Sequence, residues 1–282
     1  MTAATPPRTA ASQGSPLWYA LLFTPEPRRE VVSALLELRA DVMESARRPS
    51  EPDVARARLQ WWRAELAGFG DGREQHPLTR VLSKARPAGV VQAEYLLELV
   101  DAAESELCEP PCSNYSELAL YCYRSSGVLH EMLAGLLGLA DPANERAVRR
   151  YAQRLGTGSR LVEIIAGLGP DLAAGRRLLP RDWIRETGAS EDVSENGKMD
   201  AALLTCLDRL AGEARLALDE AEALLPQAER PQQRTGLVLA ALQRRRLASL
   251  HRQRFNPRAR PGNLGNLWAA WRAARRAINA RP

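Results

Sequence analysis

The chain has 282 residues, of which 45% are apolar and 26% charged, values typical of a soluble globular domain. Its net charge of +5 is modest and lacks the basic stripe of a nucleic-acid-binding protein, so we expect no nucleic acid partner. No run approaches the roughly 18 consecutive apolar residues of a membrane span. We predict a cytoplasmic protein, and the pI near 9.3 also suits peripheral contact with the inner face of a membrane.

The predicted elements are helical along the whole chain. Residues 1–15 are small and polar without the apolar core of a secretory signal, so we expect a disordered tail there. Beyond it, apolar residues recur at helical spacing and period-2 alternation is absent. The fold class is therefore all-α, with a single domain over residues 16–282. We predict helices at 26–47, 53–69, 77–84, 88–107, 114–138, 143–169, 197–225, 231–254 and 264–279, and one short helix within the loop 180–197.

The predicted helix at 26–47 has an acidic face. Glu37, Asp41 and Glu44 lie at i, i+4 and i+7, a spacing that places them on one side of the helix. Exposed carboxylates are common on helices, and we interpret this face as solvated. Metal ligation by Asp41 and Glu44 is the alternative.

Two further helices carry conspicuous side chains. Trp61 and Trp62 are adjacent, so they cannot both face inward, and we expect one in the core and one at its edge. His130 stands alone on the helix predicted at 114–138, where a structural role is the ordinary one, so we assign it no catalytic role.

The segment from Leu155 to Pro180 is the most informative. Glu163, Gly167 and Asp171 follow one another at i, i+4 and i+8 on one helix face. Carboxylates in such a stripe can hold magnesium, a hard cation that binds oxygen and shares the phosphate oxygens of a substrate. Here a glycine separates the two acids, and Pro170, which lacks an N–H group, is predicted to bend or break the helix just before Asp171.

This segment resembles a helix of the squalene/phytoene synthase family. The family helix reads Leu-Gly-x-Ala-x-Gln-Leu-Thr-Asn-Ile-Leu-Arg-Asp-Val-x-x-Asp and is followed by Gly-Arg-x-Tyr-Leu-Pro. The present chain matches this pattern without a gap at Gly156, Leu161, Ile164, Asp171, Gly175, Arg176, Leu179 and Pro180. In the same register Arg160 replaces the glutamine, Glu163 the asparagine, Ala166 the arginine and Gly167 the first aspartate.

The resemblance continues along most of the chain. Arg39 matches the arginine of a family Phe-Cys-Arg segment, but Val42, Met43 and Ala46 then occupy the three positions of the family's first aspartate motif. Residues 121–127 are similar to the family's Tyr-Cys-Tyr-x-Val-Ala-Gly. The resemblance implies a single-domain isoprenoid synthase-type helical bundle around a central cavity. It also implies that the cavity is lined by Arg39, Tyr121, Tyr123, Arg124, Gly127 and Arg176, the last of which contacts phosphate or caps a helix end.

Enzymes of this family condense two prenyl diphosphates with the help of magnesium. Because both metal motifs are altered while the scaffold is intact, we predict a non-catalytic homologue without a cofactor. It is similar in this respect to the branch that includes the assembly factor of mitochondrial respiratory NADH dehydrogenase. Its expected role is to bind a prenyl diphosphate or other isoprenoid lipid, or to assist a protein partner in complex assembly.

The alternative is an active, magnesium-dependent head-to-head prenyltransferase. It would condense farnesyl or geranylgeranyl diphosphate to a squalene- or phytoene-like product, with Glu163, Asp171, Asp41 and Glu44 as unconventional metal ligands.

Overall fold

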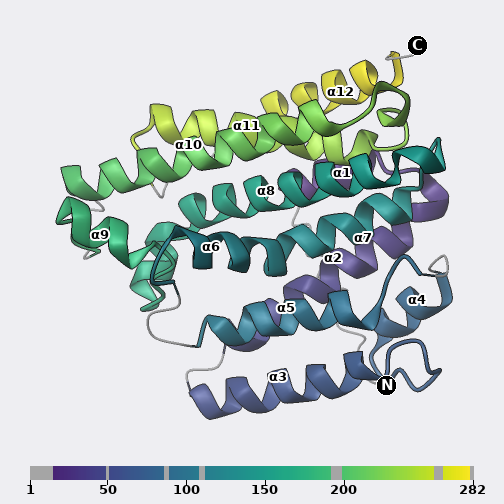
Figure 1. Cartoon of the computed structure of the whole chain (residues 1–282), viewed down its shortest axis with the longest axis horizontal. Helices are drawn as coiled ribbons and strands as arrows, with labels where there is room; N and C mark the ends of the chain where they lie inside the picture. Colours follow the sequence, from purple (N-terminus) through teal and green to yellow (C-terminus); the bar gives the residue numbers. More distant parts are fainter. Residues whose placement is uncertain are drawn as a thin grey trace.

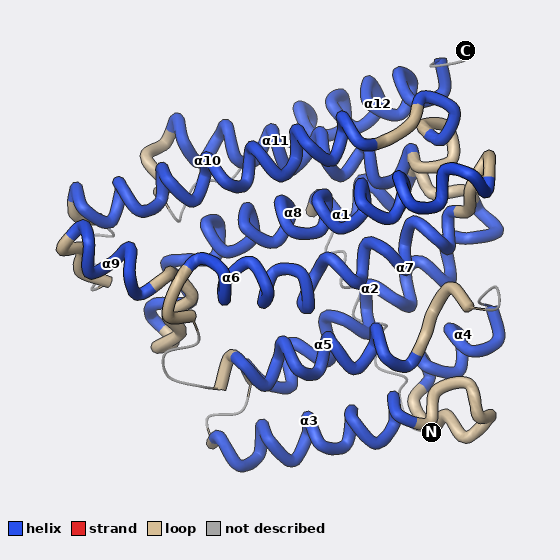
Figure 2. The backbone as a smooth tube through the Cα atoms, in the orientation of Figure 1, coloured by secondary structure: helices blue, strands red, loops and turns tan. Residues whose placement is uncertain are grey.

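Helices make up all the regular structure of the described part of the chain. The computed structural model describes residues 15–48, 51–85, 89–107, 112–191, 199–256 and 263–279, and no strand occurs among them (Figure 2). The predicted tail therefore lies outside the described residues except for Ser15, which caps the first helix. The α-helices are α1 (Pro16–Leu22), α2 (Glu26–Arg47), α3 (Pro52–Ala67), α4 (Pro77–Ala85), α5 (Ala93–Ser105), α6 (Tyr115–Cys122), α7 (Val128–Leu137), α8 (Glu145–Ala173), α9 (Arg181–Thr187), α10 (Ala201–Leu224), α11 (Arg234–Arg252) and α12 (Asn263–Asn279).

The helices stack in successive layers, with α3 at one edge and α12 at the opposite edge (Figure 1). From α3 the contacts run to α5 and α2, from α2 to α7, from α7 to α8, and from α8 to α10 and α11. One hydrophobic core joins α2 through α11 and includes Ala277 of α12. A second, smaller cluster attaches α1 and α12 to α11. The long helix α8 thus lies at the centre of the molecule, and side chains from several helices meet around it.

Most predicted helices are confirmed to within a few residues, but the helix predicted at 114–138 is interrupted. Residues Tyr123–Gly127 form one π-helical turn between α6 and α7. Such turns are rare and often occur where a helix contributes to a functional site. This one packs against the middle of α8.

Pro170 is predicted to bend or break the helix, and the predicted break is wrong. Helix α8 continues through Pro170 to Ala173. Just after this end the chain turns away at Gly175, whose φ of 76° is readily adopted by glycine. The N–H of Arg176 donates to the Asp171 carbonyl at 2.8 Å and the N–H of Gly175 to that of Leu172 at 3.0 Å, which is the Schellman arrangement of a helix end. Proline removes only one hydrogen bond in the last turns, and this terminal motif satisfies the carbonyls that follow.

The prediction for the paired tryptophans is confirmed. Trp62 is buried and donates its indole N–H to Ser45 Oγ at 3.1 Å, whereas Trp61 is 43% exposed at the surface of α3. The two rings meet edge to face. Trp62 therefore anchors α3 to α2.

Candidate functional site

An ion pair connects α2 with α8 through the interior. Arg39 on α2 donates from Nη2 to Glu163 Oε2 on α8 at 3.0 Å. Its Nε donates to the carbonyl oxygen of Ser125, in the π-helical turn, at 2.7 Å. Arg39 is thus held by two partners from different segments. Arg39 matches the arginine of the family's Phe-Cys-Arg segment, and Glu163 stands at the position of the family asparagine.

The ion pair extends into a larger network on the other side of Glu163. Arg160, one turn earlier on α8, donates to the same Glu163 Oε2 at 3.1 Å. The Arg160 side chain is only 6% exposed, and it also lies 3.4 Å from Glu106 Oε1 and contacts the Tyr121 hydroxyl. Glu106 in turn accepts two hydrogen bonds from Arg47, at 2.6 and 2.8 Å. We call this set the charge network; its members are Arg39, Arg47, Glu106, Tyr121, Arg160 and Glu163.

Both carboxylates of the charge network are ionised at neutral pH. Burial alone would raise the pKa of Glu163, but the guanidinium groups of Arg39 and Arg160 outweigh it and lower the pKa to about 2. Burial opposes ionisation of Glu106 in the same way, and its pKa is nevertheless lowered, chiefly by Arg47. The neutral hydroxyl of Tyr121 is maintained because burial raises its pKa.

A fourth arginine adds positive charge to this region. Arg246 on α11 is half-buried, and burial lowers its pKa while the charge of Glu163 partly restores it. Four guanidinium groups therefore surround two carboxylates. The local excess of positive charge favours anions over metal cations.

The other residues expected to line a cavity have different surroundings. Arg124 pairs with Glu98 on α5 at 2.9 Å, away from the charge network. The Tyr123 ring covers Gly127, since a Cβ added to Gly127 would lie 2.7 Å from Tyr123 Cδ2. Gly127 also packs against Gly156 of α8. A Cβ added to Gly156 would lie 2.7 Å from the Cα of Gly127. The two glycines thus allow close approach of the π-helical turn to α8.

The four candidate metal ligands are engaged elsewhere. Glu163 belongs to the charge network, and Asp171 accepts from Arg176 at 2.7 Å. Glu44 lies 3.4 Å from Arg48 on the exposed side of α2, and Asp41 acts electrostatically on His76. Within the described ranges no three His, Cys, Asp or Glu residues gather as a metal site. Magnesium usually binds through one or two free carboxylates together with substrate oxygens, and the two acids of α8 do not fit this role because each is already paired with arginine. Arg176 both closes α8 through its backbone and neutralises Asp171 through its side chain.

A narrow apolar cavity lies beside the charge network. It encloses about 30 Å³ between α1, α2, α7, α8 and α11, mostly against leucine, alanine and valine side chains. His130 and Tyr151 also face it. His130 Nδ1 lies 2.8 Å from the Ser126 carbonyl, while its Nε2 and the Tyr151 hydroxyl have no hydrogen-bond partner in the described structure. Burial lowers the pKa of His130 to about 4, so the ring is neutral at pH 7.

Sequence reasoning missed half of the charge network. Arg47 and Glu106 carried no recognisable signal, because Glu106 follows the end of α5 and the two residues are 59 positions apart. In the sequence pattern Arg160 is distinguished only as the replacement of a glutamine. A charged residue among the small and apolar residues 155–165 was the available signal that it is buried and paired.

Comparison with known proteins shows the family to which this chain belongs. A family model described as squalene/phytoene synthase matches residues 11–265, so the chain belongs to this family. The phytoene synthase of Mycobacterium bovis is 27% identical over 248 residues, which cover 86% of this chain and 78% of that protein. Phytoene synthase 2 of Solanum lycopersicum is 27% identical over 204 residues, covering 72% of this chain. The chain spans 66% of that tomato protein and 49% of the phytoene synthase of an Oncidium hybrid cultivar.

Solved structures confirm the isoprenoid synthase-type fold. A dehydrosqualene synthase crystallised with a ligand superposes with a TM-score of 0.76 at 18% identity, covering 93% of this chain and 90% of that one. A squalene synthase from Alicyclobacillus acidocaldarius gives a TM-score of 0.68 at 20% identity, covering 85% and 89%. The predicted fold class is therefore confirmed.

Proposed function

We propose that this chain is a non-catalytic member of the squalene/phytoene synthase family that acts as an assembly protein. The observation that carries the proposal is the Arg39–Glu163–Arg160 arrangement. In the family pattern, the helices that correspond to α2 and α8 contribute the carboxylates that hold magnesium and diphosphate. Here the acid retained on α8 is paired with two guanidinium groups, and the positions expected to be aspartates on α2 are Val42, Met43 and Ala46, all buried and without acidic groups.

The size of the interior cavity favours an assembly role over lipid binding. Pockets for small molecules generally have about 300–1,000 Å³. The cavity between α1, α2, α7, α8 and α11 has about 30 Å³, room for one or two water molecules. Burying a prenyl chain there would require the helices to separate. The proposed function therefore uses the outer surface of the bundle, and no cofactor takes part in it.

The test is a magnesium-dependent assay of diphosphate release from farnesyl and geranylgeranyl diphosphates with the purified full chain. We expect no release above the rate without protein. Asp171→Ala is the informative variant and Asp53→Ala, at a carboxylate that is 93% exposed, is its control. Turnover that Asp171→Ala abolishes and Asp53→Ala preserves would establish the active prenyltransferase instead.

Two binding measurements separate the remaining roles. Farnesyl diphosphate is titrated with and without magnesium, and we expect no tightening by the metal because the available groups are guanidinium ions. Organic extraction of the purified protein followed by mass spectrometry then tests for bound isoprenoid. A stoichiometric isoprenoid would favour the lipid-binding role over assembly.

A further inference from the structure

The outermost helix exposes large side chains and buries small ones. The buried side of α12 carries small side chains: Ala270 and Ala274 pack on α11 and α1, and Ala277 and Asn266 are also nearly inaccessible. Trp268 is 58% exposed, Trp271 46% and Ile278 46%. Helices normally bury their largest apolar residues, so the exposed side of α12 carries an unusual concentration of large apolar side chains.

The exposed side of α12 is also strongly basic. Arg272, Arg275 and Arg276 project from it, and the helix contains no Asp or Glu. None of the three has a carboxylate partner within the part of the chain that the structure describes. The guanidinium groups of Arg272 and Arg275 lie over the rings of Trp268 and Trp271, at 5.1 and 5.2 Å from their centroids. We call this set the α12 surface; its members are Trp268, Trp271, Arg272, Arg275, Arg276 and Ile278.

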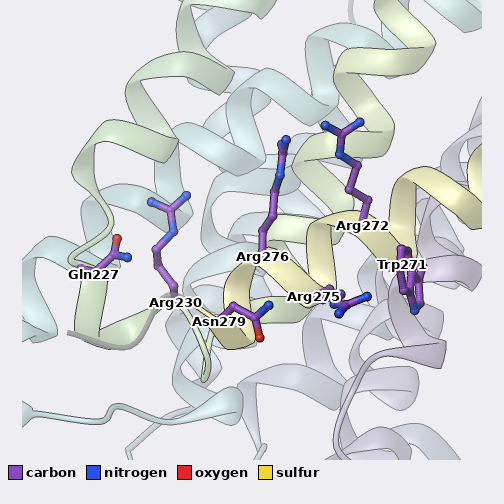
Figure 3. Close-up of a pocket in the computed structure, with 7 residues that line it drawn as sticks. All are labelled: Gln227, Arg230, Trp271, Arg272, Arg275, Arg276 and Asn279. Atoms are coloured by element: carbon purple, nitrogen blue, oxygen red, sulfur yellow. The ribbon is translucent and has the colours of Figure 1, made fainter.

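A hollow beside the α12 surface collects further positive charge. It encloses about 570 Å³ and is open to solvent. Figure 3 shows Arg272 and Arg276 extending from the same part of α12, with Arg230 and Gln227 contributed by the neighbouring segment between α10 and α11. Arg230 is fixed by Glu222 at 2.7 Å. Guanidinium groups arranged in this way match the oxygens of a phosphate group.

We propose that the α12 surface docks the protein on an anionic lipid bilayer. Tryptophan prefers the interface between lipid and water because its ring is apolar and its N–H is polar, and arginine binds lipid phosphate from the same depth. The apolar residues enter the headgroup region while the arginines remain at the phosphates. Docking is peripheral, since no helix of the described residues is long and apolar enough to cross a bilayer.

Charge argues against a second copy of this chain as the occupant. Two identical α12 surfaces facing each other would bring six arginines together without an acidic partner from the helix. The position of α12 at the edge of the bundle leaves it accessible to a planar surface (Figure 1). The side chains that anchor α12 to α11 lie on the opposite side of α12 from the α12 surface. Among them, Asn266 Oδ1 accepts a hydrogen bond of 3.1 Å from Arg245 Nε of α11.

The test is co-sedimentation of the full chain with vesicles of phosphatidylcholine, with and without phosphatidylglycerol. We expect binding to the anionic vesicles only, weakened by salt because exposed charges are screened. Arg272→Gln with Arg275→Gln should weaken binding by about tenfold or more. Trp268→Ser with Trp271→Ser should abolish the quenching of tryptophan emission by brominated lipid. All variants change exposed side chains, and circular dichroism verifies their fold.

Matched variants elsewhere on the surface provide the control. Arg58→Gln with Arg146→Gln removes two exposed arginines from other helices, and Trp61→Ser removes a tryptophan that is 43% exposed. These variants should bind vesicles as the unmodified protein does. The proposal is overturned if anionic vesicles do not bind at low salt, or if the control variants lose as much binding as the α12 variants. It is equally overturned if the tryptophan variant converts a dimer to a monomer in light scattering.

Discussion

Arg39 on α2 and Glu163 on α8 form a direct ion pair of 3.0 Å across the interior of the bundle. Each residue has a second partner, Ser125 for the arginine and Arg160 for the glutamate. The pair is thus part of a continuous set of charges rather than a surface contact. It joins α2 and α8, the two helices that hold metal between them in the family pattern.

Glu163→Gln should destabilise the protein. The substitution leaves two guanidinium groups without their shared carboxylate, and breaking a buried pair from one side is costly because the remaining charge is poorly solvated. Since the Glu163 side chain is 23% exposed, we expect a loss of about 1–3 kcal/mol in the free energy of unfolding. Urea denaturation monitored by circular dichroism measures it.

Glu44→Gln is the matched control for this prediction. Glu44 lies on the same helix as Arg39, and its pairing with Arg48 at 3.4 Å is half-exposed. Exposed pairs contribute little, so we expect a change of at most about 0.5 kcal/mol. Equal losses in the free energy of unfolding for Glu163→Gln and Glu44→Gln would show that the interior ion pair stabilises the protein no more than an exposed pair does.

Stability should fall with decreasing pH in two stages. His130 has a pKa of about 4 in the folded protein against 6.5 ordinarily. Burial disfavours the charged form of the ring, and the charge of Arg39 lowers the pKa further, while the Ser126 carbonyl and Glu163 raise it only in part. The unfolded chain therefore binds the proton more readily between pH 6.5 and 4, and stability decreases as pH falls through this window, by up to about 3 kcal/mol. Below pH 4.5, protonation of Glu163, whose folded pKa is about 2, removes a further contribution.

His130→Gln should remove the first stage and retain the second. Urea midpoints measured through both windows distinguish the two groups. If the variant loses stability between pH 6.5 and 4 as steeply as the unmodified protein, another group is responsible.

The helical fold was predictable from the sequence because it follows from local periodicity. The bounds 26–47 agree with those of α2, and the inward Trp62 with outward Trp61 follows from helical geometry alone. The end of α8 was misplaced because the hydrogen bonds of Gly175 and Arg176 compensate for Pro170. The charge network was not predictable, since Arg39, Glu106 and Glu163 come from distant segments and only the tertiary fold brings them together. The pattern identified Arg39, Arg160 and Glu163 individually but not that they pair with one another.

Gly156→Ala should be strongly destabilising. A Cβ at this position would lie 2.5 Å from the Ser126 carbonyl oxygen and 2.7 Å from the Gly127 Cα, both backbone atoms that cannot move independently. Overpacking of this kind costs about 1–3 kcal/mol or more. Gly212→Ala in α10 is the control, because an added Cβ there meets nothing within 4 Å. Gly212→Ala should stabilise the protein by up to about 1 kcal/mol through helix propensity.

Thermal unfolding of both variants measures the difference in their stability. A Gly156→Ala variant as stable as the unmodified protein would mean that α8 and the π-helical turn are farther apart.

Two buried tyrosines test the charge network by the same chemical change. The Tyr121 hydroxyl bonds to Glu106 and Arg160, whereas the Tyr151 hydroxyl faces the narrow cavity without a partner in the described chain. Tyr121→Phe leaves two buried charges with one bond fewer and should cost about 1–3 kcal/mol. Tyr151→Phe removes a hydroxyl that gains no protein hydrogen bond, so its stability should be unchanged within about 0.5 kcal/mol or increase. Both rings remain buried, which makes apolar burial equal in the two comparisons.

Urea denaturation with unchanged m-values gives the two free energies of unfolding directly. A larger loss for Tyr151→Phe than for Tyr121→Phe would show that water or a ligand in the cavity binds the Tyr151 hydroxyl more strongly than the charge network binds Tyr121.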